Sequence, residues 1–295
     1  EHKNYEKNKN KNNTMKNAIF PFFISDAYFY YNNDIPFLIE AKPINKKGIL
    51  IPPTSFYKIK IGENVSDISY NQFIDILDEK KCFEFSKKKP IIFFKGANTG
   101  ADKHNMRMKL KNIVDENHDK RYNISIADKF IPMYEFCQYK YLLNLPGHQP
   151  WSYRLMKILT MGSLIIDVKV RQSYDDGRTF NEKWIMIYEG FFKKDDDFIE
   201  IDYDWIMDRT KNTEVYDIYN KVNEIYEFYQ KNDEKFKKIV NNCKKKGDIL
   251  DMKIFNSTYD IILDSITREL YRKNKEEDID NFIKNLIENN KCEKI

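Results

Sequence analysis

Between residues 90 and 168, short apolar runs alternate with amphipathic segments, and this alternation limits the possible folds more than any other feature of the chain. The apolar runs have the length of strands, while the segments between them repeat their apolar residues at helical spacing. Strands that alternate with helices form a parallel sheet with helices on both faces. We therefore expect strands at 90–94, 123–126, 141–145 and 163–168, and helices at 105–114, after Pro132 and at 152–161.

The segment before this alternation has a different pattern. Residues 1–14 are polar and charged, which is typical of a solvated tail. From Met15 onward, short apolar runs are separated by turn-forming residues, and Ser69 and Gln72 stand at capping-box spacing before a helical segment. We expect strands at 18–24, 36–41 and 48–51, and a helix at 69–79.

After about residue 212 the pattern becomes helical, because apolar residues recur at steps of three and four. Amphipathic helices of this kind would cover the rest of the fold. The sequence therefore divides into a tail at 1–14, an N-terminal half at 15–89, a second half at 90–212, and C-terminal helices at 213–295 that pack across both halves.

Composition and charge exclude several classes of function. Lys and Arg number 50 against 46 acids, which gives a net charge of +4, and the two signs are interleaved along the chain. A nucleic-acid binder carries a larger basic excess on one face, so nucleic acid is not an expected partner. No apolar run approaches the roughly 20 residues that span a bilayer, so we expect no membrane-spanning segment. The polar first residues are unlike a signal peptide, which makes the cytoplasm the default expectation.

The four cysteines show no diagnostic spacing. None belongs to a Cys-x-x-Cys pair, so the sequence indicates neither a zinc site nor a dense disulfide framework. We expect ordinary reduced thiols at Cys82, Cys137, Cys243 and Cys292.

Two loops that lead from a strand into a helix carry the candidate site, because ligands of doubly wound sheets bind outside the carboxyl ends of the strands. The first loop, residues 95–100, contains two glycines and precedes a helix whose start includes Arg107. Glycines permit close backbone approach, the helix N-terminus offers free N–H groups, and Lys95 and Arg107 add charge, so this loop suits a phosphate. A plain turn followed by a helix cap is the other interpretation of the same residues.

The second loop, residues 146–151, follows the strand predicted at 141–145. Ser152 is a suitable N-cap for the next helix, but Arg154 stands in the first turn, where acids are usually favoured over bases. A cation there costs stability unless an anion binds beside it. The alternative is an arginine that extends to solvent.

These two loops carry a resemblance to a known family. FFKGANTG at 93–100 with NMR at 105–107, and QYKYLLNLPG…SYRLMKILTMGSLI within 138–165, resemble the signatures of the Rumi-type protein O-glucosyltransferases. These form glycosyltransferase family 90, together with capsule-associated and lipopolysaccharide-modifying proteins. The likeness extends from about Ile24 to Gln230. It implies a GT-B-like α/β fold, in which two Rossmann-like halves face a cleft, with a helical C-terminal segment.

The resemblance also implies a reaction: an inverting, metal-independent transfer from UDP-glucose, UDP-xylose or UDP-N-acetylglucosamine to a hydroxyl of a protein or glycan, without a cofactor. One carboxylate must take the acceptor proton, while fixed cations stabilise the departing diphosphate. The implied base is Asp26, which follows an apolar run and precedes Tyr28, although such an aspartate also caps turns. The implied donor-binding residues are Lys95, Gly96, Asn98, Thr99, Asn105, Arg107, Gly147, Ser152 and Arg154.

The chain departs from the family pattern at three points. Lys95 stands in place of the family's usual arginine, and an ammonium group cannot form the bidentate fork of a guanidinium. Residues 148–151 are one residue longer than the matching stretch of some relatives. The portion before Asp26 is also much shorter than in relatives, which leaves the acceptor-binding half the least defined part of the expected fold.

Two other functions are compatible with the sequence. Asp202 and Asp204 follow an apolar alternation at 198–201, and glycosyltransferases of another architecture hold a divalent cation with such an Asp-x-Asp pair. Solvated acids, or a helix cap before Trp205, are the plainer interpretation. The chain could also be a non-catalytic nucleotide-sugar-binding module that keeps the fold and lacks the base.

Overall fold

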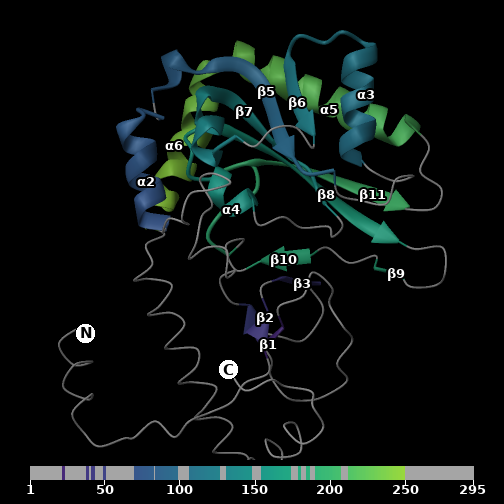
Figure 1. Ribbon diagram of the computed structural model, residues 1–295, viewed down its shortest axis with the longest axis horizontal. Coiled ribbons are helices and arrows are strands. Elements are labelled where there is room, and N and C mark those ends of the chain that lie inside the picture. Colours follow the sequence, from purple (N-terminus) through teal and green to yellow (C-terminus); the bar gives the residue numbers. More distant parts are fainter. Residues whose placement is uncertain are drawn as a thin grey trace, which may run out of the picture.

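The computed structural model of the protein has a mixed α/β fold built around one large parallel sheet (Figure 1). It describes residues 22–23, 38–39, 41–43, 49–50, 70–82, 84–98, 106–126, 131–147, 154–173, 179–180, 184–186, 190–206 and 212–249.

Five parallel strands form the sheet, in the spatial order β11, β8, β7, β5 and β6. A short strand, β9, pairs antiparallel with β8. These strands confirm the parallel sheet and the four strands predicted between residues 90 and 168. Their bounds are β5 Lys89–Gly96, β6 Tyr122–Ile126, β7 Tyr139–Asn144, β8 Leu164–Ser173, β9 Thr179–Phe180 and β11 Ile199–Ile206.

The helices predicted at 69–79 and 105–114 are confirmed, and a five-residue helix occupies the segment predicted at 152–161. The helix expected after Pro132 is instead a 3-10 helix, because only six residues separate that proline from the next strand and such short connectors favour the tighter turn. None of the described helices is long and apolar enough to cross a membrane. The bounds are α2 Tyr70–Glu79, η2 Phe85–Lys87, α3 Met106–Glu116, η3 Met133–Gln138, α4 Arg154–Ile158, α5 Asn212–Lys231 and α6 Asp233–Ile249.

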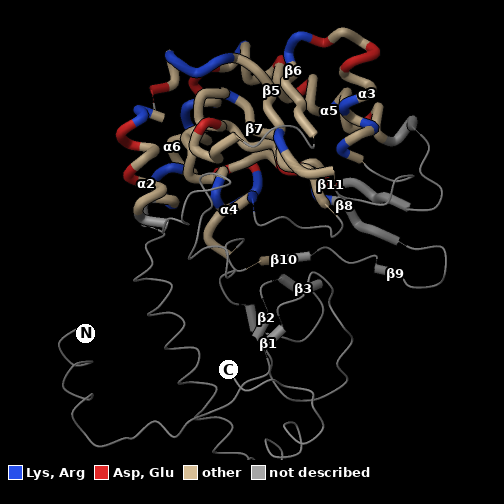
Figure 2. Tube along the Cα trace, viewed as in Figure 1, with Lys and Arg blue, Asp and Glu red and all other residues tan. Residues whose placement is uncertain are grey.

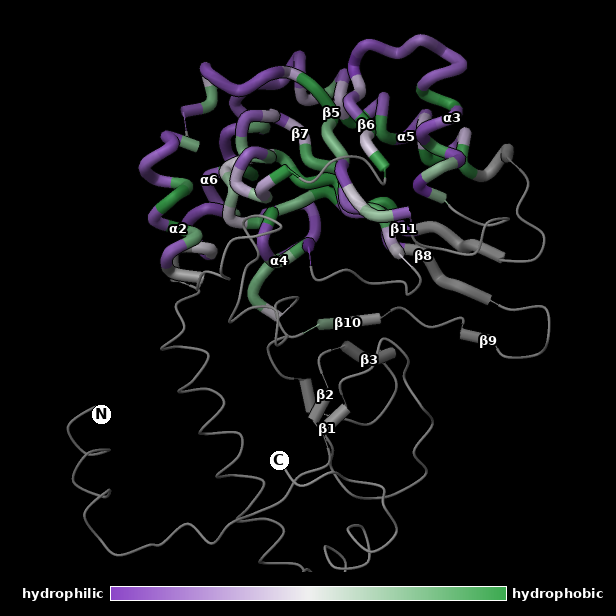
Figure 3. Tube along the Cα trace, in the orientation of Figure 1, coloured by the Kyte–Doolittle hydropathy of each residue, from purple (hydrophilic) through white to green (hydrophobic). Residues whose placement is uncertain are grey.

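Alternate side chains of the strands face two separate apolar cores. On one face of the sheet, Ile92 and Phe94 of β5 pack with α3, α5 and the first part of α6. On the other face, Phe93 packs with α2, η3 and α4. Figure 3 shows hydrophobic residues along the strands and hydrophilic residues on the outer surfaces of the helices. Lys and Arg are interleaved with Asp and Glu over those outer surfaces, as the sequence indicated (Figure 2).

The chain reverses its direction across the sheet between β5 and β7. From β5 it passes through α3 to the edge strand β6, then returns beyond β5 to β7 and continues through α4 to β8 and finally β11. Since α3 packs on one face and α4 on the other, the loops that leave β5 and β7 diverge from neighbouring strand ends. This topological switch point is where open α/β sheets bind their ligands.

Short strands form two small sheets beside the large one (Figure 1). One is parallel in the order β1, β2, β4, and the other pairs β3 antiparallel with β10. They confirm strands within the apolar runs at 18–24, 36–41 and 48–51, and the β3–β10 pair joins the N-terminal segment to the half that contains the large sheet. The bounds are β1 Phe22–Phe23, β2 Leu38–Ile39, β3 Ala41–Pro43, β4 Ile49–Leu50 and β10 Trp184–Met186.

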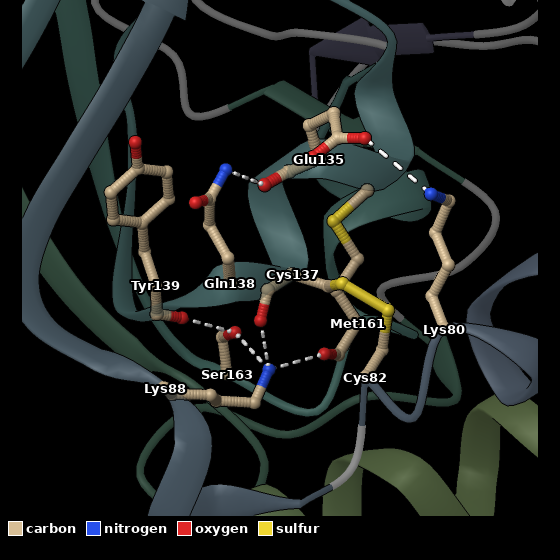
Figure 4. Close-up of a disulfide and its surroundings, with 9 residues drawn as sticks. All are labelled: Lys80, Cys82, Lys88, Glu135, Cys137, Gln138, Tyr139, Met161 and Ser163. Carbon is tan, nitrogen blue, oxygen red and sulfur yellow. Dashed lines mark hydrogen bonds and ion pairs between the residues drawn. A yellow bond between two sulfur atoms is a disulfide. The ribbon is translucent and has the colours of Figure 1, made fainter.

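A disulfide joins Cys82, just beyond the end of α2, to Cys137 in η3 (Figure 4). The expectation of reduced thiols was therefore wrong for these two residues, whereas Cys243 is a free, buried cysteine and Cys292 lies outside the described residues. The sequence carried no signal for the bond because 55 positions separate its cysteines. Only the fold brings their Cα atoms to 5.3 Å, within the range that a disulfide bridges.

Lys88 lies beside this disulfide, in the connection between η2 and β5. Its Nζ donates hydrogen bonds to the carbonyl oxygen of Cys137, to that of Met161 at 3.0 Å and to Ser163 Oγ at 3.1 Å (Figure 4). The side chain is only 5% exposed, and these acceptors are neutral. Burial lowers the pKa of Lys88 to about 7, because an ammonium group loses hydration there.

Raising the pH should stabilise the protein through Lys88. An unfolded lysine keeps a pKa near about 10.4, so above about pH 7 the unfolded state binds more protons than the native state, and the free energy of unfolding rises with pH. Compared with Lys88→Met, which cannot titrate, the wild type should gain up to about 1.4 kcal/mol per pH unit between about pH 7 and pH 9. Urea unfolding of both proteins across this range measures the difference, and parallel pH profiles would contradict the prediction.

Candidate functional site

The candidate site lies at the switch point, where the chain leaves the carboxyl ends of β5 and β7. The loop after β5 leads into α3, and the loop after β7 leads into α4 on the opposite face of the sheet. Each helix carries an arginine in its first turn, Arg107 in α3 and Arg154 in α4. The two arginines predicted from separate motifs therefore approach the same strand end from opposite faces.

Both guanidinium groups lie next to the aromatic ring of Phe94. The Cζ atoms of Arg154 and Arg107 lie 4.6 Å and 5.4 Å from the centroid of this ring, within the range of a cation–π contact. Gly96 lies next to all three side chains. A Cβ atom on this residue would be 3.0 Å from Phe94 Cζ, 3.1 Å from Arg154 Nη2 and 3.3 Å from Arg107 Nη1.

Arg107 is buried and connects the two loops. Its Nε donates to the carbonyl oxygen of Pro146 at 3.0 Å, its Nη1 to that of Ala97 at 2.9 Å and its Nη2 to that of Leu145 at 3.2 Å. One guanidinium therefore fixes the loop after β5 against the loop after β7. Burial lowers the pKa of Arg107 to about 10.

Arg154 is held in an electrostatically unfavourable position. Burial first, and then the positive charge of Arg107, lower the pKa of Arg154 to about 9. Two like charges around one glycine repel each other, and a bound anion would offset both the lost hydration and the repulsion. The arrangement therefore favours a ligand that carries negative charge.

The other predicted residues fall into two groups. Lys95 points along the sheet to β6, where its Nζ donates to Ser125 Oγ at 2.7 Å. Asn98 is exposed, and Gly147 is partly buried directly after Pro146, whose carbonyl oxygen accepts a hydrogen bond from Arg107. Four predicted residues lie outside the described residues: Asp26, Thr99, Asn105 and Ser152.

Sequence analysis missed a buried polar group on β7 and β8. Asn144 Nδ2 donates to Asp167 Oδ1 at 2.7 Å, and Lys169 Nζ lies 3.8 Å from Asp167 Oδ2. The signal was available, because Asn144 and Asp167 each follow directly on a short apolar run. Asn144 is the last residue of β7, before the loop of the site, and it pairs in register with Asp167 in the interior of β8, so the group fixes the end of β7 against its neighbour.

Asp202 and Asp204 also lie differently from the interpretation of the sequence. They continue β11, which runs to Ile206, and do not form a turn after it. Asp202 is exposed and is the register partner of Lys169 on β8. Among the side chains that the structure describes, no group of three His, Cys, Asp or Glu is arranged to hold a metal ion.

Substituting Gly96 by alanine should weaken binding of UDP, the ligand that the resemblance implies. The new Cβ would displace the guanidinium tips and the Phe94 ring by a few tenths of an ångström. A misplacement of about 1 Å can cost about 100-fold, so we expect the Kd for UDP to rise about tenfold. Isothermal titration calorimetry measures the change. Gly190→Ala is the matched control, because none of the described residues lies within 4 Å of the Cβ that it would gain, and an equal loss in both variants would contradict the prediction.

Comparison with known proteins identifies the family of the chain. The family model described as Glycosyl transferase family 90 matches residues 32–184, just over half of the chain, and this match includes both loops and both arginines. No curated protein matches the chain. The chain therefore belongs to glycosyltransferase family 90 and is a glycosyltransferase.

Proposed function

We propose that this glycosyltransferase moves a sugar from a UDP-sugar to a hydroxyl group of a protein or glycan, with inversion at the anomeric carbon. The observation that carries the proposal is the convergence of Arg107 and Arg154 over Phe94 at the switch point of the sheet. A diphosphate fits this position because guanidinium groups bind phosphate oxygens through paired hydrogen bonds.

The two arginines would stabilise the leaving group of the reaction. As the bond between the anomeric carbon and the UDP oxygen breaks, negative charge accumulates on the diphosphate. Cations already fixed beside it need no reorganisation at that moment. In this proposal Arg154 contacts the diphosphate, and Arg107 holds the two loops in place while adding to the positive field.

Asp26 would be the general base. Its carboxylate takes the proton of the acceptor hydroxyl while the hydroxyl oxygen attacks the anomeric carbon from the side opposite UDP. The resemblance to the Rumi-type enzymes supports this role and a GT-B-like arrangement, in which an N-terminal half brings the base to a cleft. The β3–β10 pair adds support, since it ties the N-terminal segment to the half that carries the arginines.

A UDP-release assay over UDP-glucose, UDP-xylose and UDP-N-acetylglucosamine tests the proposal, with wild type and Asp26→Asn compared in manganese and in a chelator. We expect turnover with one donor, a fall in kcat of about 10²- to 10⁴-fold in Asp26→Asn, and unchanged UDP affinity. UDP binding without turnover of any donor would identify a binding module. Activity lost in the chelator and restored by manganese would favour the metal-dependent alternative through Asp202 and Asp204.

We also propose that the protein works in an oxidising compartment, in place of the cytoplasm expected from the sequence. Cys82 and Cys137 are both buried in the core around α2 and η3, where their bond is part of the fold. Disulfides of this structural kind form and persist in secretory and extracellular compartments and are rare in the cytosol.

A further inference from the structure

Phe94 has surroundings unlike those of the phenylalanine beside it. Phe93 and Phe94 are adjacent in β5, are buried to the same extent and face opposite sides of the sheet. The ring of Phe93 stacks on Tyr139 with centroids 4.1 Å apart and meets Phe136 edge-on at 4.9 Å. The ring of Phe94 instead lies against the guanidinium groups of Arg107 and Arg154.

An aromatic ring in this position counteracts the repulsion between two cations. The face of the ring carries partial negative charge, and its attraction for a guanidinium strengthens where water is excluded. Phe94 is 1% exposed, so the contact lies in such an environment. A leucine of similar volume would fill the core without providing this attraction.

The two arginines lie at different distances from the ring of Phe94. Arg107 donates to the carbonyl oxygens of Ala97, Leu145 and Pro146, which define the position of its guanidinium. For Arg154, the cation–π contact with Phe94 is the shorter of the two, at 4.6 Å against 5.4 Å for Arg107. A cation–π attraction strengthens as the cation approaches the ring, so the ring acts more strongly on the guanidinium of Arg154.

We propose that Phe94 is a positioning residue for the donor diphosphate: its ring holds the guanidinium of Arg154 beside that of Arg107 before the donor binds. This inference rests on the proposed function, because it assumes that Arg154 contacts the diphosphate. It goes beyond that function by assigning a role to a buried apolar residue that does not touch the substrate.

Site-specific replacement of Phe94 by 4-fluoro-, 3,5-difluoro- and 3,4,5-trifluorophenylalanine tests the role. Fluorine withdraws charge from the ring face step by step and changes the shape of the ring little. We expect the Kd for UDP to rise in steps, to about fivefold or more in the trifluoro protein, as a cation–π contact of ordinary strength predicts. The Kd for inorganic pyrophosphate should rise in the same steps, because the effect acts through the diphosphate.

The same series at Phe93 is the matched control, since that ring packs on aromatic rings and, within the part of the chain that the structure describes, has no cation over its face. Its UDP affinity should stay constant, and thermal unfolding of each protein should confirm an intact fold. A flat series at Phe94, or equal slopes at both positions, would overturn the positioning role while leaving the proposed function in place. A wild-type protein that binds neither UDP nor pyrophosphate would overturn both.

Discussion

Arg154→Met should remove most of the affinity for UDP and leave the ligand-free protein at least as stable as the wild type. Methionine keeps the apolar stem of the side chain and removes the guanidinium. The substitution removes two charge-assisted hydrogen bonds to the diphosphate, and this loss should raise the Kd for UDP about 100-fold. The transfer rate should fall by about 10²- to 10³-fold, as it does when one donor to a developing anion is removed.

The stability expectation follows from the position of Arg154. Burial and the charge of Arg107 both lower its pKa, so the charged form is disfavoured in the ligand-free fold. Removing that charge relieves the repulsion. Groups held in unfavourable positions for binding commonly lower the stability of the fold, so replacing them raises it. Calorimetry with UDP and urea unfolding without it measure the two effects separately.

Arg107→Met is the informative comparison, because its guanidinium holds the carbonyl oxygens of Ala97, Leu145 and Pro146. Losing these bonds should lower the free energy of unfolding by about 2 kcal/mol, in contrast to Arg154→Met. Lys120→Ala removes one exposed charge at the opposite end of the sheet and should change neither property. An Arg154→Met protein that binds UDP normally would contradict the assignment of the site.

The sequence predicted the local elements of this fold well because their signals are local. The alternation of apolar runs identified strands β5 to β8, and the helix signal that begins at Ser152 correctly placed Arg154 in a first turn. The order of the strands has no such local signal. It depends on the side of the preceding strand on which each helical connection places the next one. That order creates the switch point and brings Arg107 and Arg154 to one strand end.

The same limit applies to Phe94. Alternation along β5 shows that Phe93 and Phe94 face opposite sides of the sheet, but the pattern indicates core residues at both positions. The difference between them depends on α3 and α4, which bring cations to one ring and not to the other. Side chains at Asp26, Thr99, Asn105 and Ser152 lie outside the described residues, so their roles stay predictions.

Removing the disulfide should cost the protein about 4 kcal/mol of its free energy of unfolding. The Cys82–Cys137 bond closes a loop of 55 positions, and chain-entropy estimates for a loop of this length give about that value. Domains are commonly stable by about 5–15 kcal/mol, so the loss is a large fraction of the total. Urea unfolding of the Cys82→Ala, Cys137→Ala double variant, and of wild type with a reductant, measures it.

The affinity of the folded double variant for UDP should be unchanged. Cys82 and Cys137 precede β5 and β7, whereas the two arginines lie beyond the opposite ends of these strands, roughly 20 Å away for a six-residue strand. Cys243→Ala is the control, because it removes a buried thiol that makes no disulfide, and its effect should be small and independent of the reductant. Two results would show that the bond does not hold α2 to the sheet. In one, the reductant leaves the stability of the wild type unchanged; in the other, it lowers the stability of the double variant as well. If the double variant loses stability but keeps its affinity for UDP, the two ends of the sheet have different roles: one end anchors the fold and the other binds the donor.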